Sequence, residues 1–156
     1  MKRTHYILVT GIILLMAVLT TPRAVQAVLG GSADSVTADQ KALAAMRSVT
    51  TIHANYSVQQ VESDAVTVRE YISSSDIVFA VVWSGLVNPD LTQLLGSYSD
   101  EYREAQRQMP RTHGKRTQQV KASHVVVETW GHMRHLQGRA YVPALVPQGV
   151  TIDEIK

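Results

Sequence analysis

Cysteine is absent from all 156 residues of this chain, and that absence excludes several kinds of chemistry. No disulfide can form, so stability must come from packing even in a compartment that would permit disulfides. The chain also has no thiol nucleophile and no cysteine to carry a lipid. It lacks a Gly-x-Ser-x-Gly elbow and the glycine spacing of a phosphate loop or dinucleotide fingerprint. No known catalytic class is therefore indicated, and we expect no cofactor.

The first 27 residues have the pattern of a secretory signal peptide. Lys2 and Arg3 supply a positive start, and an apolar run of 13 residues follows from Ile7 to Leu19. This run is too short for a permanent membrane helix, and no later segment approaches the ~18 apolar residues that a span needs. We therefore expect an exported protein, periplasmic or extracellular.

Small residues at Val25 and Ala27 predict cleavage between Ala27 and Val28. The alternative is an uncleaved N-terminal anchor. Residues 1–27 are thus expected to be the signal peptide. Residues 28–156 then have a length that suits one domain with a single core.

Removal of the leader changes the charge of the chain. The leader holds three of the 15 Lys and Arg residues (Lys2, Arg3 and Arg23) and none of the 13 acids, so the formal charge falls from +2 to −1. The basic pI of the precursor therefore belongs to the leader. It does not indicate a nucleic-acid partner.

Hydrophobic periodicity predicts the first half of the domain. A capping box at Thr37 and Gln40 predicts a helix over residues 35–48. Period-two patterns then predict strands at residues 56–61 and 65–73, followed by a strand at 77–83 that is apolar on both faces. In the second strand, alternation separates two faces, which carry Val66, Val68 and Ile72 on one side and Thr67, Arg69 and Tyr71 on the other.

The second half begins with another helix. Asn88-Pro89-Asp90 predicts its start, with Asn88 as N-cap, and the helix runs to about Gln108 with an interruption near Gly96. Residues 107–118 are basic, without an acid, and are expected to form an exposed loop. Two last strands are predicted at 123–130 and 133–142, before an extended tail.

The predicted fold class is α+β, a single domain with an antiparallel sheet of about five strands in the order α-β-β-β-α-β-β. One or both helices should cover the sheet face that bears Val66, Val68 and Ile72.

Four blocks of sequence carry a family resemblance. They are Leu29-Gly30-Gly31-Ser32; Val68-Arg69-Glu70-Tyr71-Ile72-Ser73 with Val78 to Val81 and Trp83; Pro89-Asp90-Leu91 with Leu94-Leu95-Gly96; and Gly131-His132-Met133-Arg134 with Gly138-Arg139-Ala140-Tyr141, Pro143, Pro147 and Asp153-Glu154-Ile155. In this order the chain resembles a family of small exported bacterial proteins known only as a domain of unknown function. Leu86 departs from the pattern, in which Pro follows Trp-x-Gly. The resemblance implies export and no particular reaction.

Glu70 is the most unusual single residue. Alternation places it on the apolar face of its strand, where an unpaired carboxylate is costly to bury. Arg139 on a later strand is a candidate partner. One interpretation is a structural ion pair, or a bulge that turns Glu70 outward. The other is a polar ligand-binding pocket that uses Glu70 and Arg139, with Trp130 and His132 as further candidates.

His132 and His135 form an H-x-x-H pattern, with His124 on the preceding strand. Neutral imidazoles bind zinc or copper, so a metal site is one interpretation. The other is that these are polar histidines at a turn. We therefore predict no metal site and keep His132 and His135 as a weak candidate.

The basic loop is a candidate site for anionic envelope components such as lipid head groups or acidic polysaccharide. Its residues are Arg107, Arg111, Lys115 and Arg116. The alternative is a solvated loop without a ligand.

Three functions follow from these patterns. The first is a non-catalytic periplasmic or secreted binding or accessory module for an envelope component or a partner protein. The second is a small hydrolase-like enzyme with a site around Glu70, Arg139 and His132. The third is a structural or assembly role in the envelope through strand pairing.

Overall fold

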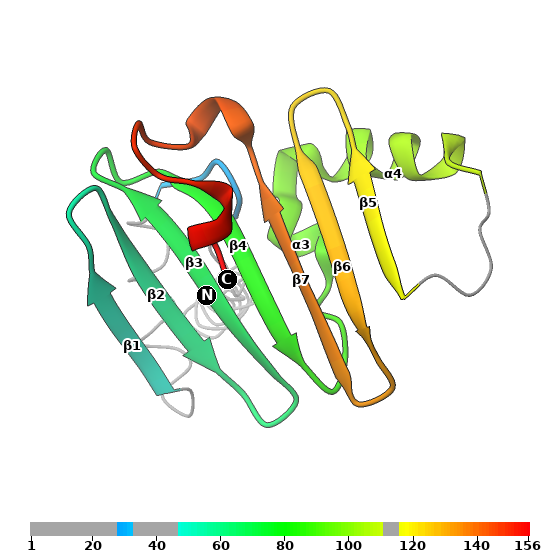
Figure 1. Ribbon diagram of the computed structural model, residues 1–156, viewed down its shortest axis with the longest axis horizontal. Helices are drawn as coiled ribbons and strands as arrows, with labels where there is room; N and C mark the ends of the chain where they lie inside the picture. The colour runs from blue at the N-terminus through cyan, green and yellow to red at the C-terminus, as the bar shows by residue number, and fades with distance from the viewer. Residues whose placement is uncertain (1–27, 33–46, 111–115) are drawn as a thin grey trace, which may run out of the picture.

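The computed structural model describes residues 28–32, 47–110 and 116–156 of the chain. These residues form a sheet of seven strands, all paired antiparallel, in the spatial order β1-β2-β3-β4-β7-β6-β5 (Figure 1). The strands are β1 (Arg47–Ile52), β2 (Tyr56–Glu62), β3 (Val66–Ser73), β4 (Val78–Gly85), β5 (Thr117–Lys121), β6 (Val126–His132) and β7 (His135–Tyr141).

Helical structure lies between β4 and β5 and in the C-terminal segment, residues 142–156. The first stretch consists of α3 (Leu91–Leu95), the 3-10 turn η1 (Gly96–Tyr98) and α4 (Ser99–Gln108). The C-terminal segment contains the 3-10 turns η2 (Pro143–Leu145) and η3 (Ile152–Glu154). Within the described ranges, no helix combines the length and the hydrophobicity that a membrane span requires.

β4 is the central strand and is buried on both faces. Its first six side chains, Val-Phe-Ala-Val-Val-Trp, are at most 2% exposed. A register shift passes over Phe79, so that Tyr71 of β3 lies opposite Ala80 whereas Ile72 lies opposite Val78. A strand that is apolar on both sides is stable only when each face of the sheet has a cover.

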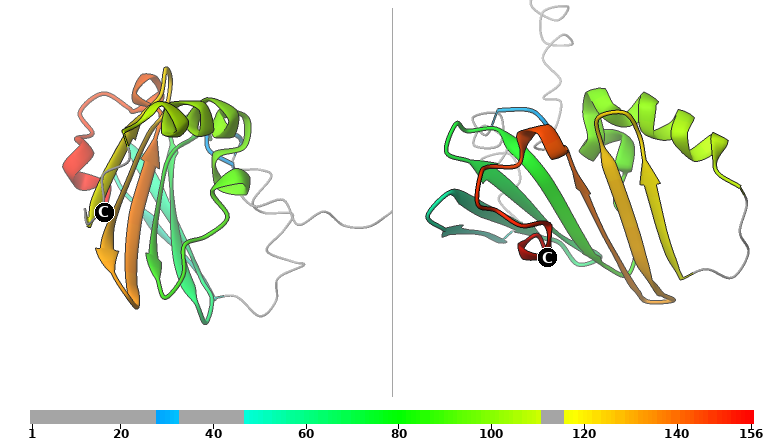
Figure 2. Two further views of the ribbon diagram at one scale, coloured as in Figure 1. Left: turned by 90° about the vertical axis from the view of Figure 1, so that its right-hand side faces the viewer. Right: turned by 45° about the horizontal axis from the view of Figure 1, so that its top comes forward.

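Two different covers meet this requirement (Figure 2). On one face, the helix side, α3, α4 and residues 28–32 pack on the sheet. Leu94 and Leu95 of α3 and Tyr102 of α4 join a buried cluster there with Val81 and Trp83. On the other face, the tail side, the C-terminal segment packs on a second buried cluster, formed by Tyr71, Phe79, Ala80, Val82, Val126, Tyr141 and Ile155.

The prediction that helices cover the face of Val66, Val68 and Ile72 is confirmed, because all three belong to the helix-side cluster. The helix begins slightly later than predicted. Asp90, not Asn88, is the N-cap, and its carboxylate accepts a hydrogen bond from the Thr92 amide at 2.9 Å. The predicted interruption is at Gly96, which has φ +51°.

Residues 28–32 contribute to the core as well as to the cover. Leu29 is 1% exposed, and its amide donates to the Leu94 carbonyl at 3.0 Å. The amide of Gly30 donates to the Val78 carbonyl, and Val78 donates back to Gly31. The Leu-Gly-Gly-Ser block therefore connects α3 to the start of β4.

The predicted fold class, α+β with about five strands and an N-terminal helix, is wrong. The described residues are mostly a seven-stranded antiparallel sheet with helical structure over Leu91–Gln108. Residues 35–46 of the predicted first helix lie outside the described residues. Its last two positions, Arg47 and Ser48, begin β1.

β1 and β5 were missed because they bury few side chains. β1 leaves Val49 and Ile52 exposed, so its Ser and Thr residues show no apolar period. β5 buries Val120 alone, and its first residues were assigned to the basic loop. Both strands are at the edges of the sheet, where they are held mainly by backbone hydrogen bonds to one neighbouring strand and less by burial of side chains.

The backbone of Leu86 joins the loop before β3 to the end of β4. Its amide donates to the Ala65 carbonyl at 2.8 Å across the end of the β3–β4 pair. Proline at this position has no N–H and could not make this bond.

Leu29→Ala is expected to lower the free energy of unfolding by about 2–5 kcal/mol, because it leaves a cavity between α3 and the sheet. Leu86→Ala is the matched control, since Leu86 is exposed; it should change stability by less than about 0.5 kcal/mol. Urea unfolding followed by circular dichroism measures both. Equal effects of the two substitutions would show that residues 28–32 are not part of the core.

Candidate functional site

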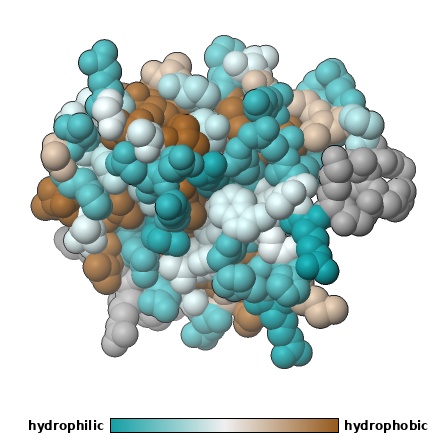
Figure 3. Space-filling model, viewed as in Figure 1, coloured by the Kyte–Doolittle hydropathy of each residue, from teal (hydrophilic) through white to brown (hydrophobic). Residues whose placement is uncertain are grey.

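The C-terminal segment covers only part of the tail side of the sheet. It crosses the upper parts of β3 and β4 in Figure 1 and leaves their lower parts uncovered. We call this uncovered half the open face. Strand register and alternation assign to it Gln60, Thr67, Arg69, Ser84, Thr117, Gln119, Glu128, Trp130 and Gln137. Figure 3, which views this side, is mostly teal to white over the centre and the lower part of the molecule.

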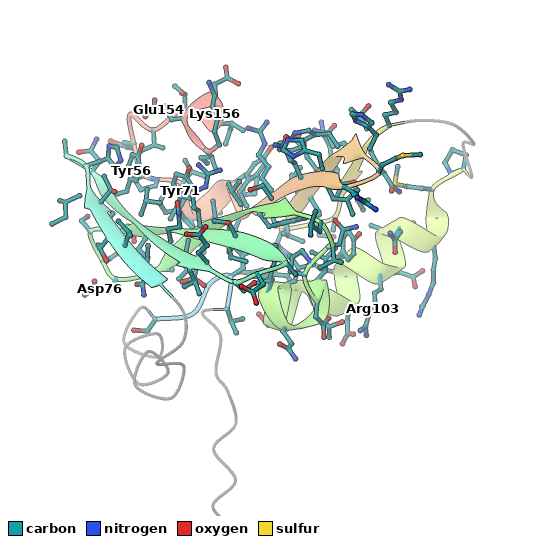
Figure 4. The ribbon with its side chains drawn as sticks, turned by 90° about the horizontal axis from the view of Figure 1, so that it is seen from below. Tyr56, Tyr71, Asp76, Arg103, Glu154 and Lys156 are labelled. Carbon is teal, nitrogen blue, oxygen red and sulfur yellow. The ribbon has the colours of Figure 1, made fainter. Side chains whose placement is uncertain are left out.

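Two side chains hold the C-terminal segment in place. The Tyr71 hydroxyl donates to the Lys156 carbonyl at 2.8 Å and accepts from the Lys156 amide at 3.0 Å. Arg139 donates through Nη1 to the carbonyls of Ile152 at 2.8 Å and Ile155 at 3.2 Å. Figure 4 shows Tyr71 and Lys156 on the same side of the sheet, with Arg103 of α4 on the other.

On β5, β6 and β7 the polar side chains of the open face are bonded to one another. Arg139 forms an ion pair with Glu128 at 2.5 Å, and Gln119 donates to the same carboxylate. Glu128 and Arg139 are only 17% and 18% exposed as side chains, so water screens this pair little. Because Arg139 also bonds to Ile152 and Ile155, this ion pair connects the open face to the C-terminal segment.

Trp130 stands next to this network in a pocket of about 540 Å³. Its indole N–H donates to the side-chain oxygen of Gln137, which fixes the ring beside β7. The pocket is lined by Arg116, residues 117–119 of β5 and residues 128–130 of β6. Its volume is within the range of small-molecule sites, and its lining of amides, hydroxyls and one large aromatic ring suits a ligand that is both polar and flat.

On β2, β3 and β4 the open face has a different character. Gln60, Thr67, Arg69 and Ser84 are all half-buried there. Within the described ranges none of these four side chains makes a hydrogen bond or an ion pair. They therefore hold donors and acceptors that a ligand can use. Alternation had placed Thr67 and Arg69 on this face, but no motif marked them as a site.

Glu70 lies on the helix side, as alternation predicted, and it is 4% exposed. Gln59 lies directly opposite on β2 and is 7% exposed. In the described part of the chain neither Oε2 of Glu70 nor Nε2 of Gln59 has a hydrogen-bond partner. Burial in these surroundings raises the pKa of Glu70 to about 8.

The expected partner of Glu70 is elsewhere. Arg139 faces the tail side and pairs with Glu128, so the Glu70–Arg139 ion pair does not form. The alternative, a bulge that turns Glu70 outward, is also wrong, because Glu70 keeps its register with Gln59 and Val81. Sequence alternation gives the face of a strand residue but not which strand will lie beside it.

The histidines do not converge on one point. His132 and His135 are exposed cross-strand neighbours at the end of the β6–β7 hairpin. His124 lies in the turn before β6, at the other end of that strand, and its ring is 2.9 Å from the carboxylate of Glu101 on α4. The described residues contain no group of three His, Asp or Glu placed to hold a metal ion.

The basic candidates are divided among different environments. Arg107 belongs to α4 and forms an ion pair with Glu104 at 3.2 Å. Arg116 lines the Trp130 pocket. Arg111 and Lys115 lie outside the described residues.

The described part of the chain is therefore a sheet domain with one polar face that the C-terminal segment covers only in part, and this face contains Trp130. The family model for proteins of unknown function named DUF2844 matches residues 25–155, and the chain belongs to this family. The resemblance to a domain of unknown function is thereby confirmed. No curated protein and no solved structure matches the chain.

Glu70 makes stability depend on pH in a testable direction. The unfolded carboxyl releases its proton above pH 4.5, whereas the folded one keeps it to about pH 8. Stability should therefore fall as pH rises from 4.5 to 8, by up to about 1.4 kcal/mol per pH unit, and level off above pH 8. Glu70→Gln should remove this loss, as measured by urea unfolding at pH 5, 7 and 9.

Glu62→Gln is the control for that series, since Glu62 is an exposed glutamate at the end of β2. It should keep the pH dependence of the natural chain. Parallel pH curves for Glu70→Gln and the natural chain would contradict the buried protonated carboxyl.

Proposed function

We propose that this protein is exported and that residues 28–156 act as a non-catalytic binding module for an envelope component, namely a polysaccharide. The observation that carries the proposal is the open face. It combines the Trp130 pocket with a row of amide, hydroxyl and guanidinium groups on the neighbouring strands.

Sugar rings suit this combination of groups. Their hydroxyls pair with amide and hydroxyl side chains, and their C–H faces pack on the electron-rich face of an indole. The Trp130 ring is already fixed by its bond to Gln137, so little side-chain entropy is lost when a ligand packs on it.

The open face offers poor chemistry for catalysis. Glycoside hydrolysis commonly uses two carboxyl groups about 5–10 Å apart, one as an acid and the other as a base or nucleophile. Glu128 is a single carboxylate in the pocket, and Arg139 and Gln119 already occupy its oxygens. The hydrolase-like alternative around Glu70, Arg139 and His132 has no common site, because Glu70 faces the helix side whereas Arg139 faces the tail side.

Export is supported by the leader pattern and by the place of the predicted cleavage. Cleavage after Ala27 leaves Val28 to Ser32 intact, which is the segment that bonds to α3 and β4. The signal peptide can thus be removed without loss of the core contacts of Leu29.

Cells expressing the chain should export a product that begins at Val28, detected by N-terminal sequencing and intact mass of the envelope and medium fractions. Ala27→Leu places a large residue at the cleavage position and should block processing. Ala144→Leu, an exposed position far along the chain, is the matched control and should be processed normally. A product that retains residues 1–27 would instead support the uncleaved anchor.

Trp130 provides a direct signal for binding, because the chain has two tryptophans and the other, Trp83, is fully buried. Deproteinised envelope polysaccharide should change the tryptophan fluorescence of the natural chain, and Trp130→Phe should lose this change. Trp130→Ala should weaken binding about tenfold, the equivalent of one lost stacking contact.

Met133→Ala is the control for the loss of an exposed side chain on the same hairpin outside the pocket. It should bind as the natural chain does. If no envelope polysaccharide changes the fluorescence of Trp130, the proposed function is wrong.

A further inference from the structure

We infer that the polysaccharide is acidic and that the guanidinium of Arg69 binds its anionic groups, an inference that rests on the proposed function. Arg69 lies on β3 near the middle of the open face, between Val82 of β4 and Gln60 of β2. It is half-buried. A guanidinium in such a place presents several N–H donors to a carboxylate or phosphate.

Within the described residues Arg69 differs from Arg103, Arg107 and Arg139 by having no anionic partner. Arg139 pairs with Glu128, Arg103 with Asp100 and Arg107 with Glu104. Arg69 makes no ion pair or side-chain hydrogen bond in the described part of the chain. Glu62 is diagonally across from it on β2, but this carboxylate is exposed and does not pair with Arg69.

The charge of the open face therefore favours an anion. Glu128 is neutralised by Arg139, and Glu62 at the end of β2 is the remaining carboxylate on this face of the described strands. Arg69 on β3 and Arg116 beside the Trp130 pocket outnumber it, and neither forms an ion pair in the described part of the chain. The two arginines lie on either side of Trp130 in the strand order. Two separated cations with an aromatic ring between them match a chain that carries repeated negative charges.

The arrangement also indicates an extended ligand that crosses the strands. Trp130 on β6 and Arg69 on β3 are three strand spacings apart and two residues out of register, roughly 16 Å at about 4.8 Å per spacing and about 3.3 Å per residue. Gln137, Ser84 and Thr67 continue the row from Trp130 to β3, where Thr67 is two residues from Arg69, and their side chains can bond to hydroxyls along the way. A peptide that adds to a sheet binds its edge through the main chain, whereas these groups lie on the face.

The test compares two polymers of one backbone, polygalacturonate and its methyl ester, in which the carboxylates are masked. The exported protein should bind polygalacturonate at least about tenfold more tightly than the ester, as followed by tryptophan fluorescence and calorimetry. Added salt should weaken the binding of the acid form alone.

Arg69→Gln should remove this preference by lowering the affinity for polygalacturonate about tenfold, with the affinity for the ester unchanged. Arg69→Lys keeps the charge and should retain part of the preference, so it separates loss of charge from damage to the fold. Arg103→Gln is the matched control, because Arg103 lies on the opposite side of the sheet (Figure 4) and should leave both affinities unchanged.

Equal affinity for the two polymers, unaltered by Arg69→Gln, would overturn the acidic ligand and leave the proposed function standing. A Trp130 signal with envelope polysaccharide but with neither polymer would also overturn the inference for polyuronates. Absence of any polysaccharide binding would remove the proposed function as well.

Discussion

The burial of β4 on both faces is the constraint on which the rest of the structure depends. Its first six side chains are apolar and almost without exposure, so the sheet needs a cover on each side. On the helix side α3, α4 and Leu29 supply it. On the tail side the C-terminal segment supplies it, but that segment reaches over only the upper part of the sheet. The open face exists because the second cover is smaller than the first.

The two parts of the open face are prepared for a ligand in different ways. On β5 to β7 the side chains are bonded to one another, which holds Trp130 and Glu128 in fixed positions. On β2 to β4 they are half-buried and make no side-chain bond to any other described residue, so their hydrogen-bonding capacity remains available. A ligand that packs on the fixed ring of Trp130 costs little side-chain entropy there, and it can form new hydrogen bonds with the polar side chains of β2 to β4.

The sequence predicted those features that depend on burial. A clear hydrophobic period indicated the face of Glu70, the helical stretch to Gln108 and the helix-side cluster. It also indicated the central strand, which was predicted at residues 77–83 and is found at Val78–Gly85. β1 and β5 bury few side chains and therefore show no such period. For this reason the sequence predicted about five strands where the structure has seven. The ion pair of Arg139 was assigned to the wrong glutamate, since strand order decides neighbours and alternation does not. No local sequence pattern marks Arg69, because what distinguishes it is that no described residue of the neighbouring strands pairs with it.

The two ends of the described chain have a consequence for how the domain is made. Leu29, near the start, packs with Val78, Val81 and α3, and Ile155, next to the last residue, packs with the cluster of Tyr71 and Phe79. Leu29 and Ile155 are more than 120 positions apart in sequence, yet they cover opposite faces of β4. While the chain is being synthesised from its N-terminus, β4 cannot be enclosed until residue 155 has been added. Folding of this domain must therefore finish only after residue 155 has been synthesised, and one face of its most apolar strand stays exposed until then.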